Sequence, residues 1–127
     1  MRRDAELWWI QAKRDYRTAQ NCHRSRDYYA SVFFCHQAVE KAMKAAIVQN
    51  LRELPPRSHN LTELCDALDM PRKFRAFFME LTPEYVITRY PDAAGGPIES
   101  LYDGHISRRI LDRTKEVLSW VSKRLRK

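Results

Sequence analysis

The chain has 127 residues, of which 44% are hydrophobic and 31% charged, and its formal net charge is +7. This length suits a single domain over 1–127 with a core of its own, and no run approaches the roughly 18 apolar residues of a membrane-spanning helix. The three cysteines are an odd number without CxxC spacing, which argues against a secreted disulfide framework. The N-terminus lacks the apolar stretch of a signal peptide, so we expect a cytoplasmic protein with free thiols and no membrane attachment.

The first half of the chain predicts two long helices. An apolar stripe at spacings of four and three residues, beginning at Trp8, predicts a helix over about 4–23. A short polar turn follows, and the segment 28–51 contains neither glycine nor proline, which predicts a second long helix. Pro55 and Pro56 prevent that helix from continuing and predict a loop over about 52–58.

Shorter elements are expected in the middle of the chain. Asn60, with a glutamate three residues later, predicts the N-cap of a short helix over about 60–68, and Pro71 suits the first turn of another that reaches about residue 81. Prolines and a glycine pair over 82–97 predict a long loop with one helical turn near 84–86. A last helix is predicted over about 99–126, and Gly104 could delay its start.

These elements predict an all-α fold, an antiparallel up-down helical bundle of four to five helices. Two long N-terminal helices, short helices in the middle and a long C-terminal helix would form it. The positive charge is concentrated at the end, since residues 105–127 carry eight basic and two acidic side chains. Such a helix could meet phosphate or an acidic partner, or it could be an ordinary solvated face whose cations suit a helix C-terminus.

Four short motifs occur in the order known from one protein family. They are Trp9 followed by AKRDYRTA (12–19), YYASVFFCHQAVEKAMKAAI (28–47), SHNLTEL (58–64), and TRYPD (88–92) with Tyr102 downstream. Across nearly the whole chain this pattern resembles the HEPN family of helical domains associated with nucleotides and RNA. The resemblance implies an up-down bundle, a homodimer, and a minimal nucleotidyltransferase partner in a toxin–antitoxin-like pair.

One branch of that family consists of metal-independent ribonucleases, marked by Arg, four to six residues, then His in the C-terminal part. The last helix here has His105, but positions 98–100 hold Ile, Glu and Ser, so no arginine stands at the required distance. Arg17 with His23, and Arg52 with His59, have the spacing but lie outside the position used by the family. The departure favours a protein without that ribonuclease activity.

Six residues combine the chemistry needed to bind a phosphate and a base. Arginine offers a planar fork of donors, lysine a compact charge, and an aromatic ring can stack on a base. The candidate nucleotide- or phosphate-binding residues are Lys41, Lys44, Arg57, His59, Arg89 and Tyr90. His59, Arg57 and Arg89 are also the candidates for an atypical catalytic site, because a histidine can act as acid or base beside a cation.

Each candidate also has an ordinary structural interpretation. Arg89 could pair with a carboxylate such as Glu40 while Tyr90 packs against the bundle, and His59 could fix its loop by a hydrogen bond to backbone. The two lysines of the second helix could simply be exposed to solvent. The adjacent Cys-His dipeptides at 22–23 and 35–36 lack the spacing of zinc ligands, so we expect neither a metal nor a cofactor.

Three functions remain open at this point. The leading hypothesis is a helical module that binds nucleotide or nucleic-acid phosphate, forms a homodimer and partners a minimal nucleotidyltransferase. The first alternative is a metal-independent RNA endonuclease toxin with an atypical Arg/His site. The second is a purely structural dimerisation or assembly module whose basic last helix meets an acidic protein.

Overall fold

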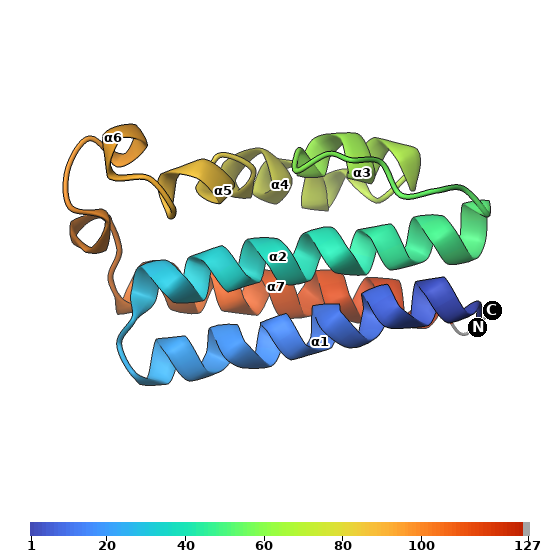
Figure 1. The fold of residues 1–127 in the computed structure, drawn as a ribbon, viewed down its shortest axis with the longest axis horizontal. Helices are drawn as coiled ribbons and strands as arrows, with labels where there is room; N and C mark the ends of the chain where they lie inside the picture. Colours follow the sequence, from blue (N-terminus) through green and yellow to red (C-terminus); the bar gives the residue numbers. More distant parts are fainter. Residues whose placement is uncertain (126–127) are drawn as a thin grey trace.

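Three long helices run side by side in the computed structural model, which describes residues 1–125 (Figure 1). Helices α1 (Arg3–Arg24) and α2 (Tyr28–Ala46) are antiparallel, and α7 (Gly104–Leu125) packs against both. The chain between α2 and α7 returns along the bundle as a row of short helices, so that a broken segment occupies the place of a third long helix. The predicted all-α antiparallel bundle is confirmed.

Small residues let the long helices approach each other closely. Ala12 and Ala19 of α1, and Ala38 and Ala42 of α2, are completely buried. Without side chains beyond Cβ, neighbouring backbones can come close, and alanine also favours the helical conformation. The alanines of the sequence therefore determine both the helix and its tight packing.

The second long helix ends as predicted but in a different conformation. After α2 the chain forms one π-helical turn, η1 (Ile47–Leu51), and Arg52 then adopts the left-handed conformation with φ 55°. A left-handed residue ends a helix, and the prolines that follow cannot resume it. The chain is thereby turned back along α2.

The middle of the chain contains more helix than predicted. Helix α3 (Leu61–Ala67) begins at the predicted cap, where the Asn60 side chain accepts a hydrogen bond from the Thr62 backbone amide at 3.0 Å. It is followed by η2 (Arg72–Phe74), α4 (Arg75–Leu81), α5 (Glu84–Ile87), α6 (Pro91–Ala94) and η3 (Ile98–Leu101). Helix α5 confirms the predicted turn, whereas α6 replaces part of the predicted loop, with Pro91 in its first turn.

The last helix begins at Gly104 rather than near residue 99. Asp103 caps it, because its carboxylate accepts a hydrogen bond from the Ile106 amide at 2.9 Å. A Cβ at position 104 would stand 3.3 Å from the Tyr28 hydroxyl, so glycine suits this close contact between α7 and α2. The predicted end at residue 126 lies outside the described residues.

The core joins α2 to α7 and to the short helices. Its largest fully buried side chains include Met43 of α2, Ile47 of η1, Phe78 of α4 and Leu111 of α7. Among the helices of residues 1–125, none is long and apolar enough to cross a membrane.

All three cysteines are free thiols. Cys35 and Cys65 are buried, and Cys22 is half-buried. Burial raises the pKa of the Cys35 thiol to about 12, although a hydrogen bond with Thr114 acts in the opposite direction.

Candidate functional site

One face of α2 carries buried polar side chains at every fourth position. His36, Glu40 and Lys44 stand one helical turn apart and are 0%, 4% and 5% exposed. A carboxylate taken out of water is costly unless it is paired and hydrogen-bonded. Glu40 satisfies both needs, because its Oε2 accepts a hydrogen bond from Lys44 Nζ at 3.1 Å and its Oε1 lies 2.8 Å from His59 Nδ1.

His36 holds the loop that carries His59. Its Nε2 lies 3.2 Å from the His59 carbonyl oxygen, which can only accept, so Nε2 carries the proton of the neutral ring. Burial lowers the pKa of His36 to about 4, and it outweighs the opposing influence of Glu40. His36 is therefore neutral near pH 7 and serves as a hydrogen-bonding group of the fold.

His59 is oriented by a carboxylate and remains open to solvent. Its Nδ1 donates to Glu40, its side chain is 51% exposed, and its ring stacks on Tyr85 with centroids 3.8 Å apart and planes 14° apart. Among residues 1–125 its Nε2 has no hydrogen-bond partner. The structural alternative for His59, a hydrogen bond from its side chain to backbone, was wrong, since the partner is the carboxylate of Glu40. A carboxylate on one nitrogen fixes the tautomer and leaves the other nitrogen available for a proton or a ligand.

Arg89 lies over aromatic rings rather than against a carboxylate. Its guanidinium carbon is 4.8 Å from the ring centroid of Tyr85, 5.4 Å from that of Tyr90 and 6.0 Å from that of Phe33. Within the described residues no carboxylate comes within 4.0 Å of it. The structural alternative for Arg89, an ion pair with Glu40, was wrong, because His59 and Lys44 already occupy that carboxylate.

The two lysines of α2 differ in their surroundings. Lys44 is buried against Glu40, and its Nζ lies 5.5 Å from the centre of the Trp8 ring, so solvent exposure was wrong for this residue. Lys41 is half-buried and pairs with Asp15 of α1 at 2.6 Å. The carboxylate of Asp15 also accepts from Gln11 Nε2 at 2.9 Å, so it joins α1 to α2.

The structure therefore brings three of the six predicted residues into one connected group. We call this group the Glu40 cluster, and its members are His36, Glu40, Lys44, His59, Tyr85 and Arg89. Tyr90 adjoins it and is 47% exposed. Arg57 lies exposed on the same loop as His59, and Lys41 belongs to the separate pair with Asp15.

Sequence reasoning missed His36 and Tyr85 and gave Glu40 only the role of a partner for Arg89. The spacing of positions 36, 40 and 44 was a usable signal, because three polar residues on one stripe of an otherwise apolar helix must find partners inside the protein. No comparable signal marks Tyr85, whose role depends on how α5 packs against α2. Over residues 1–125 no group of three or more His, Cys, Asp or Glu side chains is arranged to hold a metal ion.

Comparison with known proteins decides the family. The family model described as the HEPN domain matches residues 5–125. The chain belongs to the HEPN domain family. None of the curated proteins compared with it gives a significant match.

Two solved structures are similar to this HEPN domain over nearly their whole length. TT1696 from Thermus thermophilus has a TM-score of 0.87 and 29% sequence identity, covering 95% of this chain and 98% of that one. ST0689, described as an archaeal HEPN homologue, has a TM-score of 0.81 and 26% identity, covering 98% of this chain and 99% of that one. The resemblance carried by the four motifs is thus confirmed at the level of family and fold.

Proposed function

We propose that this HEPN domain binds a nucleotide or nucleic-acid phosphate at the exposed side of the Glu40 cluster. The observation that carries the proposal is the position of Arg89, whose guanidinium has no carboxylate within 4.0 Å among residues 1–125 and lies against aromatic rings. A guanidinium in that setting is held in place while its donors stay available for an anion.

The neighbouring residues suit the two parts of a nucleotide. His59 contacts the same Tyr85 ring as Arg89 and offers a second nitrogen at the surface, and Arg57 adds a cation on the loop of His59. Tyr90 exposes nearly half of its surface beside Arg89, which suits stacking on a base. Glu40 and Lys44 are engaged with each other, so in this proposal they position His59 and leave the phosphate to the arginines.

Calorimetric titration with adenosine 5′-monophosphate and with inorganic phosphate tests this proposal. Arg89→Ala should weaken binding of the nucleotide about tenfold or more, because a charge-assisted hydrogen bond contributes roughly 1.5–3 kcal/mol. Arg14→Ala removes an exposed arginine from α1 and is the matched control, which should bind as the natural chain does. Equal affinities of the two variants, or no binding by any of the three proteins, would refute the proposal.

The homodimer and the minimal nucleotidyltransferase partner belong to the same proposal and are supported by membership of the family alone. Light scattering after size-exclusion chromatography gives the oligomeric state, and we expect twice the mass of one chain. Co-purification with the product of the adjacent reading frame tests the partner. If the protein is a monomer and does not co-purify with the product of the adjacent reading frame, both of these parts of the proposal are refuted and only phosphate binding remains.

Ribonuclease activity is the second candidate, and the 2.8 Å contact between His59 Nδ1 and Glu40 favours it. With Nδ1 engaged, Nε2 could take the proton of a ribose 2′-hydroxyl, whose oxygen then bonds to the adjacent phosphorus. The bond from phosphorus to the 5′-oxygen breaks, that oxygen leaves as a hydroxyl with a proton from water, and a 2′,3′-cyclic phosphate remains. Arg89 would stabilise the charge that develops on the phosphate.

Incubation of total RNA with the protein in the presence of a metal chelator tests this candidate. Cleavage that disappears in His59→Ala and falls in Glu40→Gln would establish it in place of simple binding. If the protein neither cleaves RNA nor binds a nucleotide, the structural assembly module becomes the better description.

A further inference from the structure

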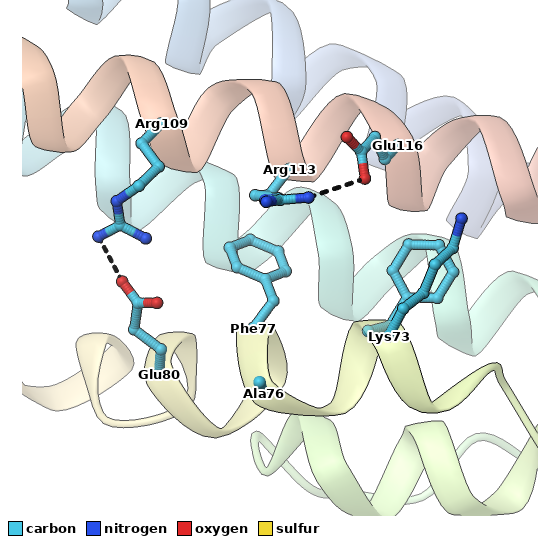
Figure 2. A pocket seen from close by; sticks show the side chains of 8 residues that line it. Lys73, Ala76, Phe77, Glu80, Arg109, Arg113 and Glu116 are labelled. Atoms are coloured by element: carbon cyan, nitrogen blue, oxygen red, sulfur yellow. Dashed lines mark hydrogen bonds and ion pairs between the residues drawn. The ribbon is translucent and has the colours of Figure 1, made fainter.

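The outer face of α7 divides into two halves that differ in how their cations are used. In the first half, each of three arginines faces a carboxylate: Arg108 with Asp112 at 3.7 Å, Arg109 with Glu80 at 2.5 Å, and Arg113 with Glu116 at 3.4 Å. Figure 2 shows Arg109 reaching down to Glu80 of α4 and Arg113 directed along α7 towards Glu116. This half is close to neutral, so it offers little attraction to a distant anion.

The second half carries cations that lack such partners. Lys115, Lys123 and Arg124 of α7 and Lys73 of η2 line a hollow of about 420 Å³. Among the described residues, no carboxylate lies within 4.0 Å of any of these four cations. Glu116 also borders the hollow, but its carboxylate contacts Arg113. Uncompensated charge that lines a groove raises the local concentration of anions.

An aromatic platform lies among these cations. The guanidinium carbon of Arg124 stands 3.7 Å from the centre of the Trp120 ring. The Phe74 ring meets the same indole edge-on, with the two ring centroids 6.5 Å apart. Trp120 is thereby held in one orientation, and its Nε1 is buried without a hydrogen-bond partner in the described part of the chain. A guanidinium stacked on an indole presents a flat surface on which a base can stack. We call this surface the Trp120 groove, defined by Lys73, Lys115, Trp120, Lys123 and Arg124.

We infer that the Trp120 groove binds a single strand of nucleic acid, with its phosphates along the lysines and a base against Arg124 and Trp120. Lys115 and Lys123 are eight residues apart, about 12 Å along the helix axis. That span matches roughly three to four stacked nucleotides at about 3.4 Å each. An acidic protein would use the same lysines but would gain little from a flat aromatic and guanidinium surface, so the strand is the better occupant.

This inference does not depend on the proposed function. In Figure 1, α7 lies behind α2, whereas the segment that carries His59, between η1 and α3, crosses the front of the row of short helices. The residues that line the hollow beside Trp120 include no member of the Glu40 cluster. Loss of one surface should therefore leave the other intact.

Fluorescence anisotropy with a labelled 15-nucleotide oligouridylate tests the groove. For four cations, the logarithm of the association constant should fall with the logarithm of salt concentration at a slope of about −3. The double substitution Lys115→Gln with Lys123→Gln should weaken binding more than tenfold at low salt and make the slope shallower by about 1.4. Arg14→Gln with Arg17→Gln removes the same charge from α1 and should bind within twofold of the natural chain.

Three outcomes would overturn the inference: no binding of the oligouridylate, equal binding by the two double variants, or displacement by polyglutamate as readily as by unlabelled oligouridylate. The last outcome would assign the groove to an acidic protein. Thermal melting of each variant shows whether it remains folded, and these exposed positions should tolerate the change. Titration of the same samples with adenosine 5′-monophosphate distinguishes the Trp120 groove from the Glu40 cluster. The groove variants should bind this nucleotide with the same affinity as the natural chain, because their changes lie outside the cluster.

Discussion

The Glu40 cluster and the Trp120 groove both gather cations, but they hold them in opposite ways. In the cluster, Lys44 is 5% exposed and its ammonium group contacts the buried carboxylate of Glu40. In the groove, Lys115 and Lys123 are exposed, and within residues 1–125 no carboxylate approaches them. A buried charge has to be paired and so becomes part of the fold, whereas an exposed one costs little and remains available. The comparison separates charges that maintain the structure from charges that can recruit a ligand.

The largest effect on stability is expected from removing the buried carboxylate of Glu40. Glu40→Ala leaves the ammonium group of Lys44 buried without its partner and removes the anchor of His59, so the free energy of unfolding should fall by about 3–5 kcal/mol. Urea denaturation followed by circular dichroism measures the change. Glu53→Ala, at an exposed position between η1 and α3, is the control. A loss below about 1 kcal/mol for Glu40→Ala would show that the cluster is not a structural unit.

A second test uses acid rather than substitution alone. The pKa of His36 is about 4 in the folded chain because of burial, below its ordinary value of 6.5. Between these values the unfolded chain binds a proton that the folded chain does not, so stability falls as the pH is lowered from 6.5 to 4, by up to about 3 kcal/mol from this residue.

His36→Gln keeps a donor for the His59 carbonyl and removes the titrating ring. The free energy of unfolding of this variant should therefore change less between pH 7 and pH 4.5 than that of the natural chain, as urea denaturation at each pH can show. His105→Gln, at an exposed position of α7, is the control for the loss of a histidine. Parallel profiles for the natural chain and His36→Gln would contradict the assignment of a buried neutral imidazole.

The smallest effects should come from the exposed face of α7. Arg113→Gln breaks an exposed pair, and Lys115→Gln removes an unpaired cation, so each should change the free energy of unfolding by less than about 0.5 kcal/mol. The same denaturation assay applies. A loss above about 1 kcal/mol for Lys115→Gln would mean that this lysine has a structural role that the contacts of the groove do not account for.

The long helices followed from the sequence because their signals are local. The apolar stripe of the long helix α1 begins at Trp8, and the cap of the short helix α3 is Asn60. Both signals depend on neighbours a few residues away, and both helices were found where predicted. The start of α7 was predicted near residue 99 with Gly104 as a later alternative, and the structure shows the later start, capped by Asp103 and with Gly104 close to Tyr28. Helix α6 was missed because its single turn begins at Pro91, which the sequence also allows in a loop.

The candidate site was predicted less completely than the fold. Arg89 and His59 were selected for their chemistry and do lie in one connected group, but the residue between them, Tyr85, carries no distinctive pattern. Glu40 was assigned to the wrong partner, since the choice between an arginine and a histidine depends on which loop packs over α2. Contacts between residues 19 or more positions apart are set by tertiary packing, and periodicity alone does not reveal them.

The buried thiol of Cys35 offers a way to observe motion of the bundle. Burial raises the pKa of this thiol to about 12, so the reactive thiolate is scarce at pH 8, and the residue is inaccessible in the closed structure. A thiol reagent can therefore modify Cys35 only when the helices around it separate briefly. In a chain with Cys22→Ser and Cys65→Ala, the modification rate would report how often that opening occurs. A ligand that holds the helices together would slow the reaction, whichever face of the molecule it occupies.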